Sequence, residues 1–170
     1  MTDSMKLAEA VAAQLARHLT DVSICPGSRN APLSLALLAR QDIRVHTRLD
    51  ERSAAFTALG MARVQRRHVG VVMTSGTAVA NALPAMVEAA HSHTPLAVIS
   101  ADRPARLVGT GASQTIQQQG IFGVYAETTQ VTEVEDIPSV AERFTKDHQV
   151  HINVAFDMPL LDAELPATPT

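Results

Sequence analysis

The sequence predicts an α/β fold, a Rossmann-like three-layer α/β/α domain built on a mainly parallel sheet of about six strands. Two observations predict this class. Short apolar, β-rich runs alternate with helical patterns along most of the 170 residues, which is typical of βαβ units. Runs such as VGVVM and LAVIS are apolar almost throughout, as expected for parallel strands that helices cover on both faces.

The expected elements follow one another in a regular order. Residues 1–19 carry apolar side chains at helical spacing and are expected to form an amphipathic first helix. We expect six strands, at residues 21–25, 42–49, 69–74, 95–101, 124–132 and 150–156. We expect the later helices at residues 32–40, 52–67, 78–91 and 137–146. In this interpretation residues 1–160 form one domain, and the Pro-, Thr- and Ala-rich residues 161–170 form a linker towards further domains.

The composition argues against several classes of function. Aromatic residues make up 3% of the chain, Trp is absent and the net charge is −3, so we expect no nucleic-acid partner. The densest basic group is Arg63, Arg66 and Arg67, which falls in the last turn of an expected helix, where cations complement the helix dipole. We also expect no membrane span. A single cysteine, Cys25, excludes an internal disulfide, and we expect a cytoplasmic protein.

Glu51 is the most informative single residue. It follows the strand expected at 42–49 and begins an alanine-rich helix. This places its carboxylate at the carboxyl-end edge of the sheet, where open parallel sheets bind ligands. A simpler interpretation is that Asp50 and Glu51 stabilise the dipole of that helix from its first turn. The residue pattern alone favours the simpler interpretation.

The turn within CPGSRNAPL is a candidate anion site at the same edge. A strand stops there at Pro26 and Gly27, and Ser28 or Asn30 is expected to cap the next helix. Free amides at the start of that helix, next to Arg29, would attract an anion. Simple turn chemistry with a solvated arginine explains the pattern equally well.

Polar segments also follow the third and fourth expected strands. The first of them, TSGTAVAN, contains Gly76, which permits a ligand to approach the backbone, but the chain lacks the GxxxxGK pattern of a phosphate loop. The second is a long connection that contains Arg103, Gln114 and the run Gln117–Gln119. A long connection of this kind is usually functional, and the alternative is a mobile, solvated loop. The sequence assigns no role to the glutamine run.

Taken together, five segments resemble the N-terminal part of one branch of the thiamine-diphosphate enzymes. They are PGSRNAPL, DERSAAF, MTSGTAVANALPAMVEA, SADRP and GTGASQTIQQQGIFG, and they occur in the same order across residues 5–160. SGTAVAN is similar to the wider family. PGSRN together with ADRP and GTGASQT is specific to the MenD branch, the 2-succinyl-5-enolpyruvyl-6-hydroxy-3-cyclohexene-1-carboxylate synthases of menaquinone biosynthesis. The resemblance implies a pyrimidine-binding domain, and it reverses the preference about Glu51.

The resemblance also implies roles for individual residues. Glu51 looks like the activating glutamate of the family, whose carboxylate hydrogen-bonds to a ring nitrogen of the aminopyrimidine and so promotes loss of the thiazolium proton. The positions that match the family's cofactor pocket are Pro26, Gly27, Thr77 and Asn81. The positions that match the substrate end of its site are Ser28, Arg29, Arg103 and Gln114. Both arginines have the fork geometry that suits carboxylates.

The reaction implied by the resemblance is decarboxylation of 2-oxoglutarate and addition of the resulting four-carbon unit to isochorismate, with thiamine diphosphate and Mg²⁺ as cofactors. The Gly-Asp-Gly segment that binds the diphosphate and the metal in this family is missing from these residues, so no metal site is expected within this chain. In the family, the diphosphate-binding domain of a second subunit completes the site. This implies a homo-oligomeric complete enzyme, a dimer or tetramer, and an inactive isolated fragment.

Two alternatives stay open. One is a non-catalytic module that binds carboxylates or has a regulatory role, because helix N-termini lie beside arginines and the diphosphate motif is missing. The other is the pyrimidine domain of a different thiamine-diphosphate enzyme, such as a decarboxylase or an acetolactate-synthase relative.

Overall fold

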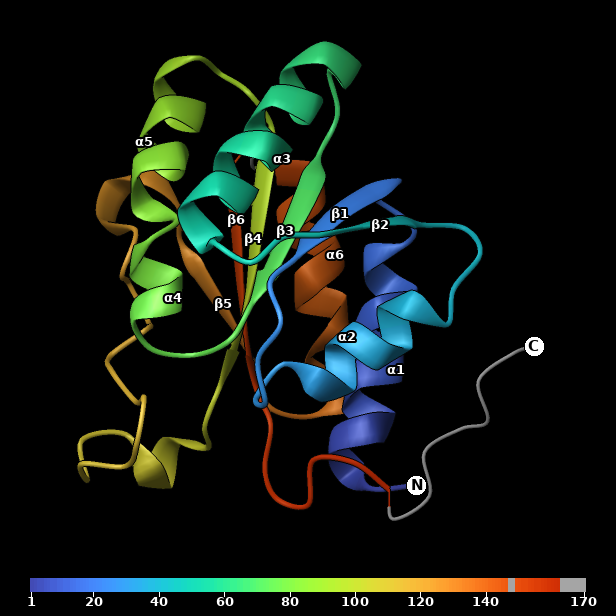
Figure 1. Ribbon diagram of the computed structural model, residues 1–170, viewed down its shortest axis with the longest axis vertical. Helices are drawn as coiled ribbons and strands as arrows, with labels where there is room; N and C mark the ends of the chain where they lie inside the picture. The colour runs from blue at the N-terminus through green and yellow to red at the C-terminus, as the bar shows by residue number, and fades with distance from the viewer. Residues whose placement is uncertain (147–148, 163–170) are drawn as a thin grey trace.

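Six parallel strands form one sheet in the computed structural model, which describes residues 1–146 and 149–162. The strand order is β2-β1-β3-β4-β6-β5 (Figure 1), and every neighbouring pair is parallel. The strands are β1 (Asp21–Ile24), β2 (Arg44–Thr47), β3 (Val69–Met73), β4 (Leu96–Asp102), β5 (Thr128–Val131) and β6 (Gln149–Ala155). The expected three-layer α/β class is confirmed.

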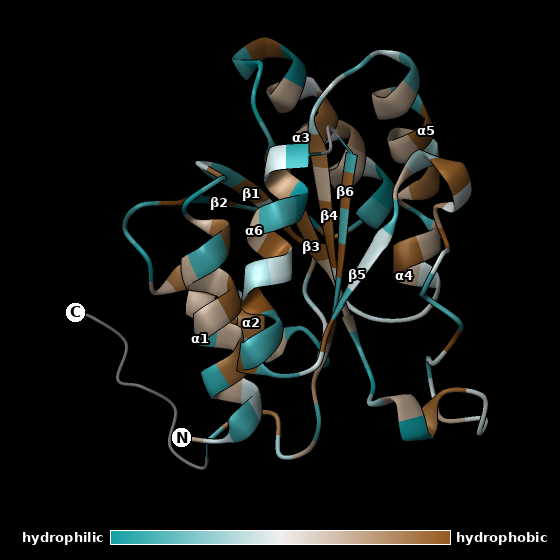
Figure 2. Ribbon diagram, turned by 180° about the vertical axis from the view of Figure 1, so that it is seen from behind, coloured by the Kyte–Doolittle hydropathy of each residue, from teal (hydrophilic) through white to brown (hydrophobic). Residues whose placement is uncertain are grey.

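Helices cover both faces of the sheet (Figures 1 and 2). On one face lie α1 (Asp3–Leu15), α2 (Ala31–Leu38) and α6 (Ile137–Lys146). On the other face lie α3 (Glu51–Gln65), α4 (Thr77–Ala80) and α5 (Leu83–His91). The connections between β4 and α6 contain three short 3₁₀ helices, at Ala105–Leu107, Gly123–Tyr125 and Val134–Asp136. None of the described helices combines the length and the apolar character needed to cross a membrane.

The sheet divides the core into two apolar layers. Leu15 of α1 and Leu37 of α2 are fully buried in one layer, and Ala58 of α3 and Met86 of α5 are fully buried in the other. Every residue of β3 and β4 is buried, which explains why these strands are apolar almost throughout. Figure 2 shows β3 and β4 mainly in brown, the colour of hydrophobic residues. Burial of each large apolar side chain contributes about 1.5–3 kcal/mol.

The single helix expected at residues 78–91 is wrong, because two helices occupy this segment. α4 ends at Ala80 and α5 begins at Leu83, with Pro84 in the first turn of α5. A proline has no N–H to donate to the carbonyl four residues earlier, and its ring clashes with that carbonyl. As a result, α4 is a single turn that begins directly after Gly76.

The strand expected at 124–132 is shorter than expected. Its first residues belong to the 3₁₀ helix Gly123–Tyr125, and β5 begins only at Thr128. Gly123 has a φ of 56°, which does not occur in an extended strand. The other strands and helices start and end within a few residues of the expected positions. The domain boundary at residue 160 stays a prediction, because residues 163–170 lie outside the described part of the chain.

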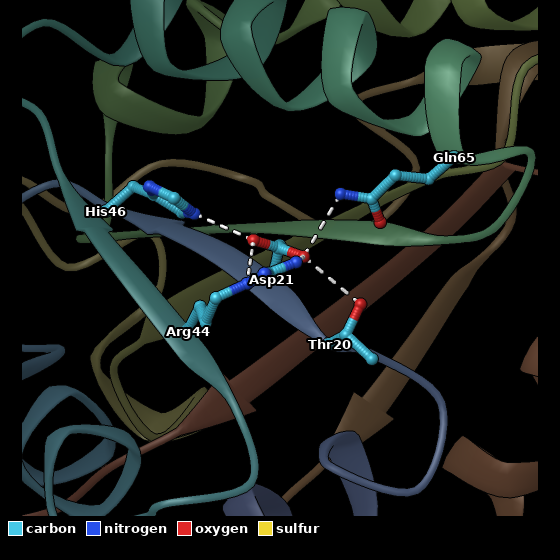
Figure 3. Close-up of polar contacts among 5 residues, drawn as sticks. All are labelled: Thr20, Asp21, Arg44, His46 and Gln65. Atoms are coloured by element: carbon cyan, nitrogen blue, oxygen red, sulfur yellow. Dashed lines mark hydrogen bonds and ion pairs between the residues drawn. The ribbon is translucent and has the colours of Figure 1, made fainter.

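A buried carboxylate connects β1, β2 and α3 near the amino-terminal ends of the two strands (Figure 3). The side chain of Asp21 is 3% exposed and accepts hydrogen bonds from Arg44 Nε and Nη2, at 3.0 and 2.8 Å. It also contacts His46 Nε2 at 2.8 Å and accepts hydrogen bonds from Gln65 Nε2 and Thr20 Oγ1, both at 3.1 Å. The hydrogen bonds from Arg44 hold the pKa of the Asp21 carboxyl well below its usual range, although burial acts in the opposite direction. This cluster links the side chains of the edge strand β2 to β1. It lies away from the carboxyl ends of the strands.

Candidate functional site

The candidate site lies at the carboxyl-end edge of the sheet, around its topological switch point. From β1 the chain passes to β2 on one side, and it later forms β3 on the other side. Open parallel sheets bind ligands in the crevice at such a point, outside the carboxyl ends of the strands. The turns after β1 and β3 flank this point, while Glu51 follows β2 and Arg103 follows β4. The strand order therefore brings the segments singled out in the sequence to one edge.

The turn after β1 packs directly against the end of β3. A Cβ atom on Gly27 would lie 2.5 Å from Thr74 Cβ and 2.8 Å from Asn30 Oδ1, so a side chain at Gly27 would force these segments apart. Asn30 occupies the N-cap position of α2, but its side chain does not cap the helix as expected. Its Nδ2 instead donates a hydrogen bond of 2.9 Å to the Cys25 carbonyl oxygen. Asn30 therefore closes the turn.

Glu51 is the first residue of α3, and it is half-buried. The capping of this helix is performed by Asp50, whose Oδ1 accepts a hydrogen bond of 2.7 Å from Ser53 N. Burial raises the pKa of the Cys25 thiol to about 12, and the negative charges of Glu51 and Asp50 add to this effect. Within the described residues, the Glu51 carboxylate forms no hydrogen bond or ion pair. It is therefore a half-buried acceptor that is open to a ligand near the end of β1.

The turn after β3 needs a glycine, and Gln114 covers it. Gly76 has a φ of 80° and a ψ of −142°, in a region that is open almost only to glycine. Gln114 Nε2 donates to the Ser75 carbonyl oxygen at 3.0 Å, and Ser75 Oγ donates to the Gln114 carbonyl oxygen at 2.8 Å. The long connection after β4 therefore returns to the end of β3 at Gln114.

Two guanidinium groups from different strand ends approach each other at this edge. Arg103 Nη1 donates to Ser75 Oγ at 2.7 Å and to the Gln114 carbonyl oxygen at 2.9 Å, and Arg29 Nη1 donates to the Phe156 carbonyl oxygen at 2.8 Å. The pKa of Arg29 is lowered, first by burial and then by the positive charge of Arg103, while two nearby carboxylates oppose these effects. Neither guanidinium forms an ion pair with another described residue. An anion bound here would relieve the repulsion between the two positive charges.

Four other residues assigned from the sequence lie at the same edge with exposed side chains. They are Pro26 and Ser28 in the turn after β1, Thr77 at the start of α4 and Asn81 directly after α4. Among the described residues, none of these side chains forms a hydrogen bond. Their positions are compatible with contact to a ligand, and their individual roles stay predictions.

A buried hydrogen-bond network behind the site was not predicted from the sequence. His151 in β6 is fully buried, and its Nδ1 lies 2.9 Å from Thr128 Oγ1. Its Nε2 lies 2.9 Å from Ser100 Oγ, which donates its own proton to Asn153 Oδ1 at 2.6 Å. The histidine must therefore carry its proton on Nε2. Burial lowers the pKa of His151 to about 3, so the ring is neutral.

Asn153 connects this network to the strand end that carries Arg103. Its Nδ2 donates to Asp102 Oδ2 at 2.8 Å and to Gln130 Oε1 at 2.9 Å, and Asp102 Oδ1 accepts a hydrogen bond of 2.7 Å from Arg103 N. Burial raises the pKa of Asp102, while the hydrogen bond from Asn153 acts in the opposite direction. These residues line a cleft of about 380 Å³. The only signal in the sequence was the presence of polar residues within the apolar strand VHINVAF.

The arrangement fits one end of thiamine diphosphate, the cofactor implied by the resemblance. The Glu51 carboxylate is the kind of half-buried acceptor that a protonated pyrimidine ring nitrogen needs. By contrast, no group of three His, Cys, Asp or Glu side chains in the described part of the chain could hold a metal ion. Among the described residues, Glu51 is therefore the feature that fits the pyrimidine ring.

Comparison with known proteins shows the family of the chain. Residues 5–121 match the family described as "Thiamine pyrophosphate enzyme, N-terminal TPP binding domain". The chain belongs to this family. The matched range includes Glu51, both site arginines and the turns after β1 and β3. Use of thiamine diphosphate is therefore a property of the family that the chain shares.

The relatives with similar sequences show which branch of the family the chain resembles. The chain is 65% identical over 162 residues to the 2-succinyl-5-enolpyruvyl-6-hydroxy-3-cyclohexene-1-carboxylate synthase of Corynebacterium diphtheriae. It is 61% identical over 168 residues to the protein of the same name from Corynebacterium glutamicum, and 44% identical over 176 residues to that from Thermobifida fusca. The alignments cover 95%, 97% and 95% of this chain but only 31%, 31% and 32% of the relatives. The chain thus spans about a third of the length of these relatives, and its resemblance to the MenD branch is confirmed.

Proposed function

We propose that this chain is the pyrimidine-binding domain of a thiamine-diphosphate-dependent 2-succinyl-5-enolpyruvyl-6-hydroxy-3-cyclohexene-1-carboxylate synthase. The complete enzyme decarboxylates 2-oxoglutarate and adds the resulting four-carbon unit to isochorismate in menaquinone biosynthesis. The observation that carries the proposal is the half-buried carboxylate of Glu51, which lies at the switch-point edge without a partner among the described residues. The identity to the corynebacterial synthases supports the choice of substrates.

In this proposal, Glu51 manages the proton of the cofactor's pyrimidine ring. The bound cofactor supplies a carbon nucleophile and an electron sink. Glu51 accepts a hydrogen bond from the ring N–H and so favours the protonated ring. A neighbouring domain that covers this edge would remove water from the carboxylate and raise its proton affinity. Pro26, Gly27, Thr77 and Asn81 shape the pocket for the ring.

The carboxylates of the substrates are assigned to the other part of the edge. Arg29 and Arg103 provide two guanidinium groups without ion-pair partners among the described residues, and the pKa of Arg29 is lowered by burial and then by repulsion from Arg103. Bound carboxylates would replace this repulsion by charge-assisted hydrogen bonds. Ser28, next to Arg29, and Gln114, whose carbonyl oxygen accepts a hydrogen bond from Arg103, are assigned as hydrogen-bond partners of the substrates.

The remaining parts of the site are assigned to other chains or domains. We infer that a diphosphate-binding domain of a second subunit holds the diphosphate and Mg²⁺, which makes the complete enzyme a homo-oligomer, a dimer or tetramer, in the cytoplasm. Support comes from the missing Gly-Asp-Gly segment and from the lack of a metal-binding group among the described residues. It follows that the 170-residue chain alone is inactive.

The first test is Glu51→Gln in the complete enzyme, with Glu9→Gln as the matched control, because Glu9 is an exposed residue of α1. Loss of the carboxylate is expected to lower kcat by about 100-fold or more. Circular dichroism and the thermal midpoint are expected to stay unchanged in both variants. A kcat near the wild-type value in Glu51→Gln would remove Glu51 from the mechanism.

Two further measurements separate the alternatives. Product analysis with 2-oxoglutarate and isochorismate is expected to show the succinylated product, and turnover of pyruvate instead would replace the menaquinone assignment by a decarboxylase or acetolactate-synthase assignment. Calorimetry of the 170-residue chain with 2-oxoglutarate is expected to show no tight binding. Saturable binding without any other domain would favour a carboxylate-binding module.

A further inference from the structure

The glutamine run after Gln114 contains one buried member. Gln118 is 1% exposed, whereas its neighbours Gln117 and Gln119 are exposed. A fully buried amide must have its donors and acceptor satisfied, because each unsatisfied group is costly. Gln118 lies behind the candidate site, so its hydrogen-bond partners show which segments its side chain holds in place.

The Gln118 amide joins three separate segments. Its Oε1 accepts a hydrogen bond of 2.8 Å from Gly76 N, at the start of α4. Its Nε2 donates to Asn153 Oδ1 in β6 at 2.7 Å and to the Ala101 carbonyl oxygen in β4 at 3.2 Å. The amide therefore connects the turn after β3 to the two strands that lie beyond it in the sheet.

Asn153, which accepts a hydrogen bond from Gln118, is itself held in one orientation. Asn153 Oδ1 also accepts from Ser100 Oγ, and Asn153 Nδ2 donates to Asp102 and Gln130. Because both ends of the Asn153 amide are engaged, its orientation is set, and this in turn sets which way the Gln118 amide faces. The turn at Gly76 is thus tied to the buried network around β4 and β6.

The same turn contacts two of the groups assigned to substrate binding. Ser75 exchanges two hydrogen bonds with Gln114, and Arg103 donates to both Ser75 Oγ and the Gln114 carbonyl oxygen. A shift of the turn would therefore move Gln114 and Arg103 together. We propose that Gln118 is a positioning residue, which holds the Ser75–Gly76 turn so that Gln114 and Arg103 are presented to the substrate carboxylates. This inference rests on the proposed function.

The test compares Gln118→Met with Gln119→Met in the complete enzyme. Methionine keeps the length of the side chain but removes all three hydrogen bonds, so amide hydrogen exchange in the peptide that contains Gly76 is expected to speed up about tenfold or more. The KM for 2-oxoglutarate is expected to rise about tenfold, with a smaller change in kcat at saturation. Gln119→Met is expected to leave both quantities unchanged, and exchange in β1 serves as the control for intact folding.

The variant Gln118→Glu adds a second measurement, the pH dependence of KM, which a general loss of stability would not change. Its carboxylate can accept the Gly76 N–H, but its second oxygen would face two further acceptors, Asn153 Oδ1 and the Ala101 carbonyl oxygen. Protonation restores a donor towards one of them. The ratio of its KM to that of the wild type is therefore expected to fall as the pH is lowered, whereas the ratio for Gln118→Met stays constant.

Each result decides the proposal. Unchanged exchange at Gly76 in Gln118→Met would show that the amide does not hold the turn. Faster exchange with a wild-type KM would show that the turn is held but does not position the substrate groups, and this too overturns the proposal. If the wild-type complete enzyme gave no product from 2-oxoglutarate and isochorismate, the proposed function would fail, and the exchange comparison would still decide whether Gln118 holds the turn.

Discussion

Alanine at two glycines of this chain is expected to have opposite effects on stability. Gly76 has a φ of 80° and a ψ of −142°, which costs any other residue about 1–3 kcal/mol. Its added Cβ would also lie 2.8 Å from Gln114 Cγ and 3.1 Å from the Gln114 carbonyl oxygen, and such crowding adds about 1–3 kcal/mol. Because the Gln114 side chain is flexible, we expect Gly76→Ala to cost about 2–4 kcal/mol in total.

Gly60 provides the matched control for this substitution. It lies within α3, it is exposed, and its added Cβ would meet nothing within 4 Å. Alanine restricts the unfolded chain and favours the helix, so Gly60→Ala is expected to stabilise the protein by about 0.5–1 kcal/mol.

Urea unfolding of the 170-residue chain, followed by circular dichroism, measures both effects. The unfolding midpoint is expected to fall in Gly76→Ala and to rise in Gly60→Ala, with the same slope in both transitions. A Gly76→Ala variant as stable as the wild type would refute the conclusion that the turn after β3 is held in a conformation reserved for glycine. It would also weaken the structural basis for the position of Gln114.

Three other expectations concern buried polar groups. Asp21→Asn is expected to lower the free energy of unfolding by about 2 kcal/mol at neutral pH, a modest figure because Arg44 is 71% exposed. Since the folded state depresses the pKa of Asp21, urea titrations at several pH values should show this difference begin to shrink as the pH falls below the ordinary value of 3.8, and vanish only when the carboxyl of the folded protein is protonated at a much lower pH. His151 stays neutral in the folded protein down to about pH 3, while the unfolded chain takes up a proton below pH 6.5. The free energy of unfolding is therefore expected to decrease as the pH is lowered from 6.5 to about 3, by up to about 1.4 kcal/mol per pH unit. Nitrogen-detected NMR should show a His151 ring protonated on Nε2 that does not titrate between pH 8 and pH 5, and a midpoint near 6.5 would contradict the buried network. Cys25 is expected to resist thiol reagents at pH 8 until the chain is unfolded, because its pKa is raised to about 12. Because Cys25 and Glu51 lie close together, rapid labelling of the folded chain would show that the surroundings of Glu51 are open to water.

Local patterns in the sequence predicted most of the fold. The apolar runs that became β3 and β4 are covered by helices on both faces, so their composition followed directly from complete burial. Two predicted elements were wrong in their bounds because of the local effect of a single residue in each case. Pro84 divides the helix expected at 78–91, and Gly123, with its positive φ, delays the start of β5.

The candidate site could be predicted in part. Glu51, Arg29 and Arg103 each follow a strand, and the carboxyl ends of parallel strands meet at one edge, so their common location followed from the strand assignment. The capping roles did not follow, because Asp50 and Glu51 are adjacent and only the geometry of the helix start shows that Asp50 accepts the hydrogen bond from Ser53 N. The resemblance assigned roles to residues, and these roles stay predictions until the variants are measured.

By itself, the sequence determined the class of fold and the edge of the sheet that carries the polar turns, because periodicity and strand ends are local properties. The family followed from the resemblance of five segments to known enzymes. Only the tertiary structure decided which of three adjacent glutamines is buried, which polar groups meet inside the sheet, and that Arg103 lies close enough to Arg29 to add to the lowering of the pKa of Arg29 by burial. The physical reason is distance along the chain. Gln118 meets Gly76 across 42 residues and Asn153 across 35, and no local pattern reports which distant hydrogen-bond partners a folded chain brings together.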